Sequence, residues 1–312
     1  MGGLIRYVIK RIILMIPVML AVTVLMFILS SLSAGDSARI IAEKTYNAPT
    51  QEQIEEIRHR EGLDKPLFQQ YFSWLGKVVQ GDFGESYNTG RPALQELQSA
   101  FPVTLKLALK SLVLLLAVSV PLGVFSAVYQ DSVLDKITEA FSFLSVSMPA
   151  FWIGLMLLYL FGVKFRMISV IGGTSGKVPL VAAFSMDIGF FGVVIRMIRV
   201  SLRDSLKQDY IRACKAKGIP VWKIIWKHGM KNSLIPVSTK IVSIVISLLC
   251  GSAVIESIFS LNGIGALALE AVTAKDTPVL QCFILILSAV VVLLNLLADI
   301  SYSAIDRRIQ LK

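Results

Sequence analysis

The chain has 312 residues, of which 55% are hydrophobic and only 17% charged, and its mean hydropathy is +0.70. A soluble globular protein carries about 25% charged residues, and a disordered chain is poor in apolar ones, so the composition excludes both classes. The net charge of +10 is compatible with nucleic acid or an anionic membrane as partner, and the hydropathy favours the membrane. Three cysteines do not form a disulfide framework.

Six apolar segments approach or exceed the length of about 20 residues that a membrane-crossing helix needs. A cleaved signal peptide is the alternative for the first, because Arg6, Lys10 and Arg11 precede it, but its apolar run exceeds the roughly 7–15 residues of a signal core. The fourth segment is the weakest, being short and interrupted by Asp187. We therefore predict an all-α polytopic membrane protein with six transmembrane helices, at Ile12–Leu32, Ser111–Tyr129, Phe141–Val163, Val178–Ile195, Leu234–Ile255 and Val279–Ile300.

The distribution of charge between these segments predicts their orientation. Residues 196–231 carry ten Lys/Arg and two Asp, whereas residues 36–100 carry ten acids and seven Lys/Arg. Basic loops stay on the cytoplasmic side of a membrane, so both termini and the 196–231 loop are expected inside and residues 36–100 outside. The acidic 131–139 loop disagrees with this assignment, as do the basic residues between the third and fourth segments.

The outer loop contains the pattern of a short helix. Thr50, with Gln53 three residues later, forms a capping-box motif, and Gly62 and Pro66 are placed to end the helix that follows. An apolar patch follows at residues 71–75. A small cap packed on the bundle is favoured here over a contact surface for an outer partner.

The inner loop contains two short helical patterns separated at Gly218, a residue suited to the position just past a helix end. In the first pattern, over residues 209–217, Tyr210, Ala213 and Cys214 share one face because of their i, i+3, i+4 spacing. The second pattern carries a basic stripe and a parallel aromatic stripe, formed by Lys223, Lys227 and Lys231 and by Trp222 and Trp226.

Two partners are possible for this loop. A basic amphipathic helix with tryptophans suits anionic lipid headgroups, and a short helix of small residues suits insertion into a soluble protein. Alanine and glycine allow a close approach that lipid contact does not require, which tilts the choice weakly towards a protein.

The same loop carries a family resemblance. The run Asp209–Gly218, followed by His228 and residues 231–236, resembles the EAA loop of ABC importer permeases, and more narrowly that of the dipeptide/oligopeptide/nickel permease family. Further motifs similar to those of the family lie at residues 62–67, 81–84, 256–265, 276–281 and 295–309, so the likeness covers nearly the whole chain. The chain departs from the family where Cys214 replaces the usual alanine, and where Gln130-Asp131 stands in a second inner loop that is basic in the family.

The resemblance implies the type I ABC importer permease fold with a cytoplasmic coupling helix in the loop at about residues 203–233. That helix would dock on a separate ATPase subunit through Asp209, Tyr210, Arg212, Ala213, Cys214, Ala216 and Gly218. The implied partners are a homologous second permease, two ATP-binding subunits that use ATP and Mg, an extracytoplasmic solute-binding protein and membrane lipid, with no nucleic acid. The implied location is the bacterial inner membrane.

Three regions are expected along the chain. Residues 1–35 form the N-terminal tail and first transmembrane helix, residues 36–100 the extracytoplasmic loop or cap, and residues 101–312 a five-helix permease core with the coupling loop.

Neither an ATPase site nor a metal site is expected in this chain. The run Gly172–Lys177 imitates a phosphate-binding loop, but Ile171 replaces its first glycine and Val178 follows the lysine. His59 and His228 are the only histidines and are expected on opposite sides of the membrane. We therefore predict a transport subunit that is not an enzyme and binds no cofactor.

Substrate and translocation path are the least determined features. The runs Ser145–Trp152 and Asp276–Phe283 look slightly closer to nickel permeases than to di- or oligopeptide permeases, so nickel or a nickel chelate is favoured over peptides. Ionisable residues inside membranes are costly and often functional, so Asp187, with Met148 and Pro149, is a candidate for the translocation path. The alternative for Asp187 is a structural role, with a backbone donor or a lysine as its partner. A proton-coupled secondary transporter is the alternative from another class, but no convincing internal repeat supports it.

Overall fold

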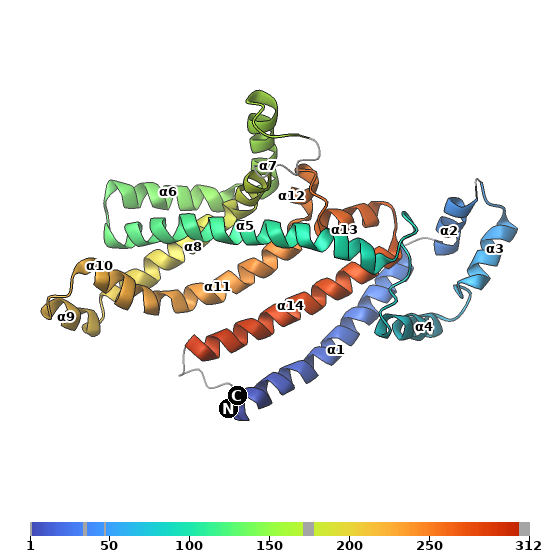
Figure 1. Ribbon diagram of the computed structural model, residues 1–312, viewed down its shortest axis with the longest axis horizontal. Coiled ribbons are helices and arrows are strands. Elements are labelled where there is room, and N and C mark those ends of the chain that lie inside the picture. The colour runs from blue at the N-terminus through green and yellow to red at the C-terminus, as the bar shows by residue number, and fades with distance from the viewer. Residues whose placement is uncertain (1, 34–35, 47, 171–177, 306–312) are drawn as a thin grey trace. The chain divides into compact units, whose positions relative to one another are not determined.

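The computed structural model describes residues 2–33, 36–46, 48–170 and 178–305, so the glycine-rich run at 172–177 lies outside it. Within these ranges every extended regular element is a helix, and the only strand-like feature is an isolated bridge between Glu85 and Pro92. The chain forms two compact units, Met1–Pro102 with Ala266–Leu293 and Val103–Gly265 with Leu294–Lys312. Helices α5 (Ala93–Val128), α13 (Ile264–Thr273) and α14 (Thr277–Ile305) pass from one unit to the other (Figure 1). The all-α class is confirmed.

The first unit contains the expected outer loop, which folds into three helices. The capping box is present, because Thr50 Oγ1 accepts from the Gln53 amide at 3.4 Å and Gln53 Oε1 accepts from the Thr50 amide at 2.9 Å. Gly62 adopts φ +68° just past the end of the helix, as its position predicts. The helices that precede the start of α5 are α1 (Gly2–Ser33), α2 (Ser37–Thr45), α3 (Gln51–Arg60) and α4 (Leu67–Val79).

Small apolar clusters hold this unit together. Buried alanines of α2 pack on buried isoleucines of α3, and α4 is joined to α1 by a hydrogen bond of 2.9 Å between Tyr71 and Thr23. Phe27 of α1 meets the Tyr71 ring edge-on, with 5.5 Å between ring centroids. A second cluster joins the start of α5 to α13 and α14 through Ala93, Leu97, Ala271, Val279 and Cys282.

The second unit is organised around α8 (Val178–Leu206), which packs against α6, α7 and α11. The sequence made this segment the weakest span, yet it is the most buried of the long apolar helices. Serine and glycine within it allow close approach of its neighbours, and its apolar residues fill the unit's core. The other elements that lie wholly in this unit are α6 (Val133–Ser147), α7 (Ala150–Leu158), the π-helical η1 (Tyr159–Lys164), α9 (Asp209–Ala216), α10 (Val221–Lys223), the π-helical η2 (Ile224–Gly229), α11 (Met230–Cys250) and α12 (Ala253–Ile258).

The expected third span is not one straight helix. Met148 leaves the helical region, with ψ 128°, because the residue before a proline is disfavoured there, and Pro149 then caps α7. The axes of α6 and α7–η1 consequently differ by 98°. The fifth span also ends early, at Cys250, and α12 follows as a separate helix.

The six-span prediction is therefore corrected in detail. Among the described residues, four helices are long and apolar enough to cross a membrane, or five if the bent pair counts as one span. Helix α11 has a shorter apolar stretch, Pro236–Cys250. The polytopic membrane class follows from the composition and from these helices together.

Gly192 sets the distance between α6 and α8. A Cβ atom there would overlap the Ser142 carbonyl oxygen and lie 2.6 Å from Ser145 Oγ, which accepts a hydrogen bond from the Gly192 amide. We expect Gly192→Ala to force the helices apart and lower stability by about 1–3 kcal/mol, the usual cost of overpacking. The measurement is the thermal unfolding midpoint of the purified full chain in detergent.

The matched control is Gly189→Ala, one turn away on α8, where a Cβ atom meets nothing within 4 Å. That variant should unfold at or slightly above the wild-type midpoint, since alanine favours the helix. Equal midpoints for the two variants would contradict the close-packing assignment.

Candidate functional site

The short helix α9 is the candidate coupling element, and local interactions define both of its ends. Gln208 precedes the helix in an extended conformation, and Gly218 follows it with φ +69°, in the left-handed region that favours glycine. This confirms the helix end that the sequence predicts. A helix of this length is marginal alone, so packing must hold it in place.

Two contacts fix α9 on the second unit. Ile211 is fully buried, and the Tyr210 hydroxyl lies 2.6 Å from Ser205 Oγ on the last turn of α8. The Ser205 hydroxyl also donates to the Gly229 carbonyl at 3.2 Å, which joins the end of α8 to the end of η2. Gly229 packs closely on α8, since a Cβ atom there would lie 2.9 Å from the end of the Leu202 side chain. Helix α9 therefore moves with α8 and η2 rather than independently.

The outward surface of α9 is made of small and charged residues. Asp209, Arg212, Ala213 and Ala216 are exposed, and Cys214 is half-buried. The sequence placed Tyr210 with Ala213 and Cys214 on one face. In the structure the Tyr210 hydroxyl contacts Ser205, while the residue as a whole is 38% exposed and so belongs to the outer surface together with Ala213. Arg212 and Ala216 flank Ala213 on that surface.

A buried ion-pair cluster lies between α6 and the part of α8 that precedes this loop. Asp135, on the first turn of α6, forms ion pairs with Arg199 Nε at 2.8 Å and Arg203 Nη2 at 2.7 Å. Its carboxylate also accepts from the Ser126 hydroxyl on α5 and from the Asp131 amide. The cluster thereby joins the α5–α6 turn to α8, the helix that continues into α9.

Sequence reasoning missed this cluster, although it left two signals. The acidic 131–139 loop disagreed with the positive-inside rule, and the structure explains why: its Asp135 neutralises arginines of α8. Arg199 and Arg203 stand at i, i+4 spacing, on one face of a helix. An acidic loop on the side where the positive-inside rule expects basic residues, together with two arginines on one face of another span, therefore predicts a buried ion pair between them.

The residues expected to line the translocation path occupy different environments. Asp187 is fully buried and accepts a hydrogen bond from Ser111 on α5, while its second carboxylate oxygen has no partner among the described residues. Met148 and Pro149 are exposed at the α6–α7 bend. Their assignment to a path stays a prediction.

Two further buried acids fix loop structure. In the second unit, Glu256 Oε1 accepts from Thr104 Oγ1 at 2.6 Å, and the same hydroxyl accepts from the Ile264 amide at 2.9 Å. In the first unit, Asp276 accepts from the Ser86 hydroxyl at 2.5 Å and from the Tyr87 amide at 3.1 Å. Burial, together with Asp276, raises the pKa of the Tyr87 hydroxyl to about 12, so it is protonated at neutral pH.

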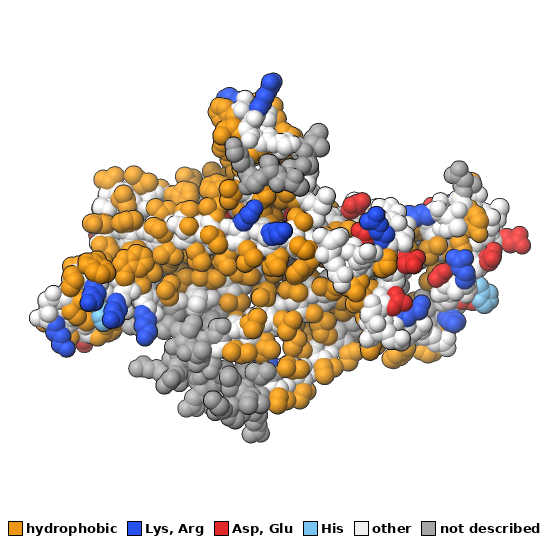
Figure 2. Space-filling model, viewed as in Figure 1, with side chains coloured by type: hydrophobic (Ala, Val, Ile, Leu, Met, Phe, Trp, Pro, Cys, Tyr) orange, Lys and Arg blue, Asp and Glu red, His pale blue; other side chains and the backbone are white. Residues whose placement is uncertain are grey.

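The first unit also contains an open cavity of about 1060 Å³. Its walls come from the end of α1, the helices α2–α4, the 82–87 loop and the start of α14. Acidic and basic side chains both line it, and Figure 2 shows red and blue side chains interspersed over α2–α4. The described residues hold no group of three or more His, Cys, Asp or Glu placed to bind a metal ion.

Comparison with known proteins agrees with this architecture. Residues 119–311 match the family of binding-protein-dependent transport system inner membrane components, and residues 4–108 match the N-terminal region of such membrane components. The chain belongs to this family. It is a permease subunit of an ABC importer, a multi-pass inner-membrane protein, and the ATPase activity belongs to other subunits.

Individual relatives extend the match over the whole length. Glutathione transport system permease protein GsiC of Escherichia coli K12 is 34% identical over 309 residues, covering 99% of this chain and 100% of the relative. The proteins of the same name from Shigella boydii serotype 4 and Shigella flexneri serotype 5b show the same identity and coverage. The resemblance to the dipeptide/oligopeptide permease family is thereby confirmed.

The Asp135 cluster gives a stability prediction for this permease. We expect Asp135→Asn to cost about 3–5 kcal/mol, because it leaves Arg199 and Arg203 largely buried without their counter-charge. The measurement is the unfolding midpoint of the full chain in lipid nanodiscs.

Glu139→Gln is the control for this substitution. Glu139 pairs with Arg199 at 3.4 Å but is 61% exposed, so its loss should cost about 0–1 kcal/mol. A similar small shift for both variants would show that the cluster contributes little to the fold.

Proposed function

We propose that α9 is the coupling helix of this permease and that it docks on an ATP-binding subunit. The observation that carries the proposal is the combination of a firmly anchored helix with a small-residue outer surface centred on Ala213. A partner approaches closely only where side chains are short, and it transmits force only to a helix that is fixed to its own subunit. ATP and Mg would bind the partner subunits, and this chain itself would hold no cofactor.

The remaining partners follow from the same proposal. A homologous second permease completes the translocation path, two ATP-binding subunits act on the two coupling helices, and a solute-binding protein delivers the substrate from outside. Both termini and the 196–231 loop lie in the cytoplasm, as the basic charge of that loop supports. Closure of the ATP-binding subunits would draw the coupling helices together, and α8 would carry the movement towards the α5–α6 hairpin through Asp135.

We propose short peptides of the size of glutathione as the substrate class. Support comes from the full-length similarity to permeases named for glutathione transport. Nickel or a nickel chelate is the second candidate, favoured by the runs Ser145–Trp152 and Asp276–Phe283, which look closer to those of nickel permeases. Asp187, which has one carboxylate oxygen without a partner among the described residues, is fully buried, so it could meet a cationic group of either substrate only if the surrounding helices moved apart during transport.

Enlarging the centre of the α9 surface tests the coupling assignment. We expect Ala213→Phe to weaken binding of the ATP-binding subunits by about 2 kcal/mol or more, roughly 30-fold in affinity. The added ring would stand at the centre of the interface and keep the partner surface away from α9. Co-purification of those subunits with the tagged permease measures the effect, and substrate uptake should fall with it.

The control is Gln130→Phe, which adds the same ring at an exposed residue of the α5–α6 turn. Membrane insertion should be normal in both variants. Wild-type assembly and uptake by Ala213→Phe would overturn the coupling assignment.

Uptake in cells with and without this chain tests the substrate class. We expect uptake of labelled glutathione to fall to background when the chain is deleted and to return when it is restored, because the second permease alone would form only half of the path. Uptake of radioactive nickel and of a labelled dipeptide is measured in the same cells. Loss of nickel uptake alone would replace the peptide proposal by the second candidate.

A further inference from the structure

The segment that follows α9 presents a second surface, distinct from the α9 surface. Trp222 and Trp226 are 67% and 54% exposed, at i, i+4 spacing, which is unusual for the largest apolar side chain. Lys223, Lys227 and Lys231 form a parallel exposed stripe beside them. We call these five residues the Trp–Lys face.

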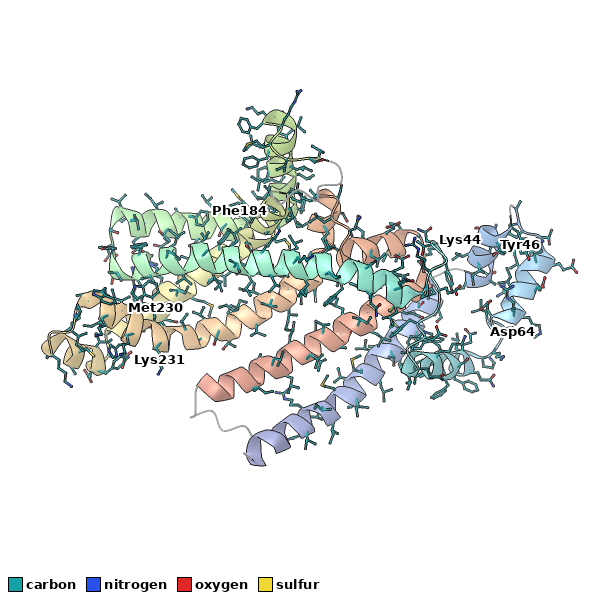
Figure 3. The ribbon with its side chains drawn as sticks, viewed as in Figure 1. Lys44, Tyr46, Asp64, Phe184, Met230 and Lys231 are labelled. Atoms are coloured by element: carbon teal, nitrogen blue, oxygen red, sulfur yellow. The ribbon has the colours of Figure 1, made fainter. Side chains whose placement is uncertain are left out.

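The opposite side of the same segment is buried, so the orientation of the Trp–Lys face is fixed. Ile224 and Met230 are almost fully buried, and Gly229 packs on Leu202 of α8. Met230 and its exposed neighbour Lys231, at the start of α11, are labelled in Figure 3. A rotation of the segment about its axis that buried the tryptophans would therefore break these contacts.

The charge of this face has no counterpart nearby in the chain. Residues 210–255 contain no acidic residue. Among the residues that the structure describes, none of the three lysines forms an ion pair. Figure 2 shows the α9–α10 segment as mainly blue and orange, with blue for Lys and Arg. The three ammonium groups are therefore available to an anionic group of another molecule.

The height of the face relative to the membrane follows from α8. Its 29 residues extend about 43 Å, close to the 40–45 Å thickness of a bilayer with its headgroups, so the end of α8 lies in or beside a headgroup layer. Gly229 is level with Ser205 near that end, through their hydrogen bond of 3.2 Å. Trp226 stands three residues before Gly229 and so within about 5 Å of this level.

We propose that the Trp–Lys face binds the anionic headgroup layer of the membrane. The lysine ammonium groups pair with lipid phosphates, and the indole rings lie among the headgroups, the position that tryptophan favours in membrane proteins. The inner loop thus has two partners: a protein on the α9 surface and anionic lipid on the Trp–Lys face. This proposal does not depend on the identity of the α9 partner or of the substrate.

Lipid is favoured over a second protein contact by the chemistry of the side chains. A protein interface core is depleted in lysine, because burying its ammonium group and ordering its long stem are both unfavourable. Headgroups accept lysine without burying it. An interface with the ATP-binding subunit is therefore the alternative that the experiment must distinguish.

The four tryptophans of the chain allow a direct test. Substituting Trp74 and Trp152 by phenylalanine leaves emission from Trp222 and Trp226 only. The full chain is reconstituted into phosphatidylcholine vesicles with phosphatidylglycerol as a minor component, with either lipid brominated in matched amount. We expect brominated phosphatidylglycerol to quench the emission about twofold or more above brominated phosphatidylcholine, since each lysine near an anionic surface contributes about fivefold to binding.

Substitution and salt separate specific binding from general contact. The excess quenching should disappear in the triple variant Lys223→Gln, Lys227→Gln, Lys231→Gln and persist in the control Lys44→Gln, Lys65→Gln, Lys77→Gln, which removes the same charge from exposed residues of the outer loop. In the chain that carries only the two Trp→Phe substitutions, with its lysines intact, the excess quenching should also fall when the salt concentration is raised to about 1 M. At that concentration charges are screened beyond about 3 Å. The salt measurement needs no lysine variant to fold.

Three results would overturn the proposal. Equal quenching by the two brominated lipids would remove the preference for anionic headgroups. If the excess quenching by brominated phosphatidylglycerol persisted in the triple lysine variant of the Trp–Lys face, the lipid preference would belong to other residues. Absence of quenching in vesicles, combined with a change in emission when ATP-binding subunits are added, would identify the face as a subunit interface.

Discussion

The ion pairs between Asp135 and the two arginines of α8 are the interaction on which the packing of α5, α6 and the end of α8 depends. A charge left unpaired in a largely buried site costs several kcal/mol of stability. The three side chains are therefore stable in their buried positions only when all three are present. The set comes from three helices, because Ser126 of α5 and the α5–α6 turn also donate to the carboxylate. Any movement of α8 along its axis therefore acts on the α5–α6 hairpin as well.

The loop that contains α9 is held by the same helix. Ser205, one half-turn beyond Arg203, contacts both Tyr210 of α9 and the carbonyl of Gly229. This hydroxyl therefore links the start of the loop to its end. The π-helical η2 has a wider backbone than an α-helix, and its last residue, Gly229, is the one that packs closely on Leu202. A short helix that would be marginal alone thus becomes a fixed projection of α8.

The sequence predicted the features that depend on local chemistry. Thr50, Gln53, Gly62 and Gly218 mark helix ends because capping and the left-handed conformation need only a few neighbouring atoms. It did not predict the 98° bend at Met148–Pro149, since a proline in an apolar run is equally compatible with a mild kink in a bundle. Nor did it identify the two arginine partners of Asp135, which lie more than sixty residues away and are set by how α6 packs on α8.

The basic charge of the inner loop consequently has two physical roles. Arg199 and Arg203 are compensated by Asp135, so they belong to the fold even though they count towards the asymmetry that orients the chain. The lysines beyond Gly218 have no acid within residues 210–255 and stand on an exposed face, so their charge acts on the surroundings. Arginine suits the first role because its guanidinium binds a carboxylate through several donors in fixed geometry, whereas lysine suits the second because its ammonium group stays hydrated on a flexible stem. In the Asp135 cluster and in the Trp–Lys face, the type of basic residue therefore matches its role.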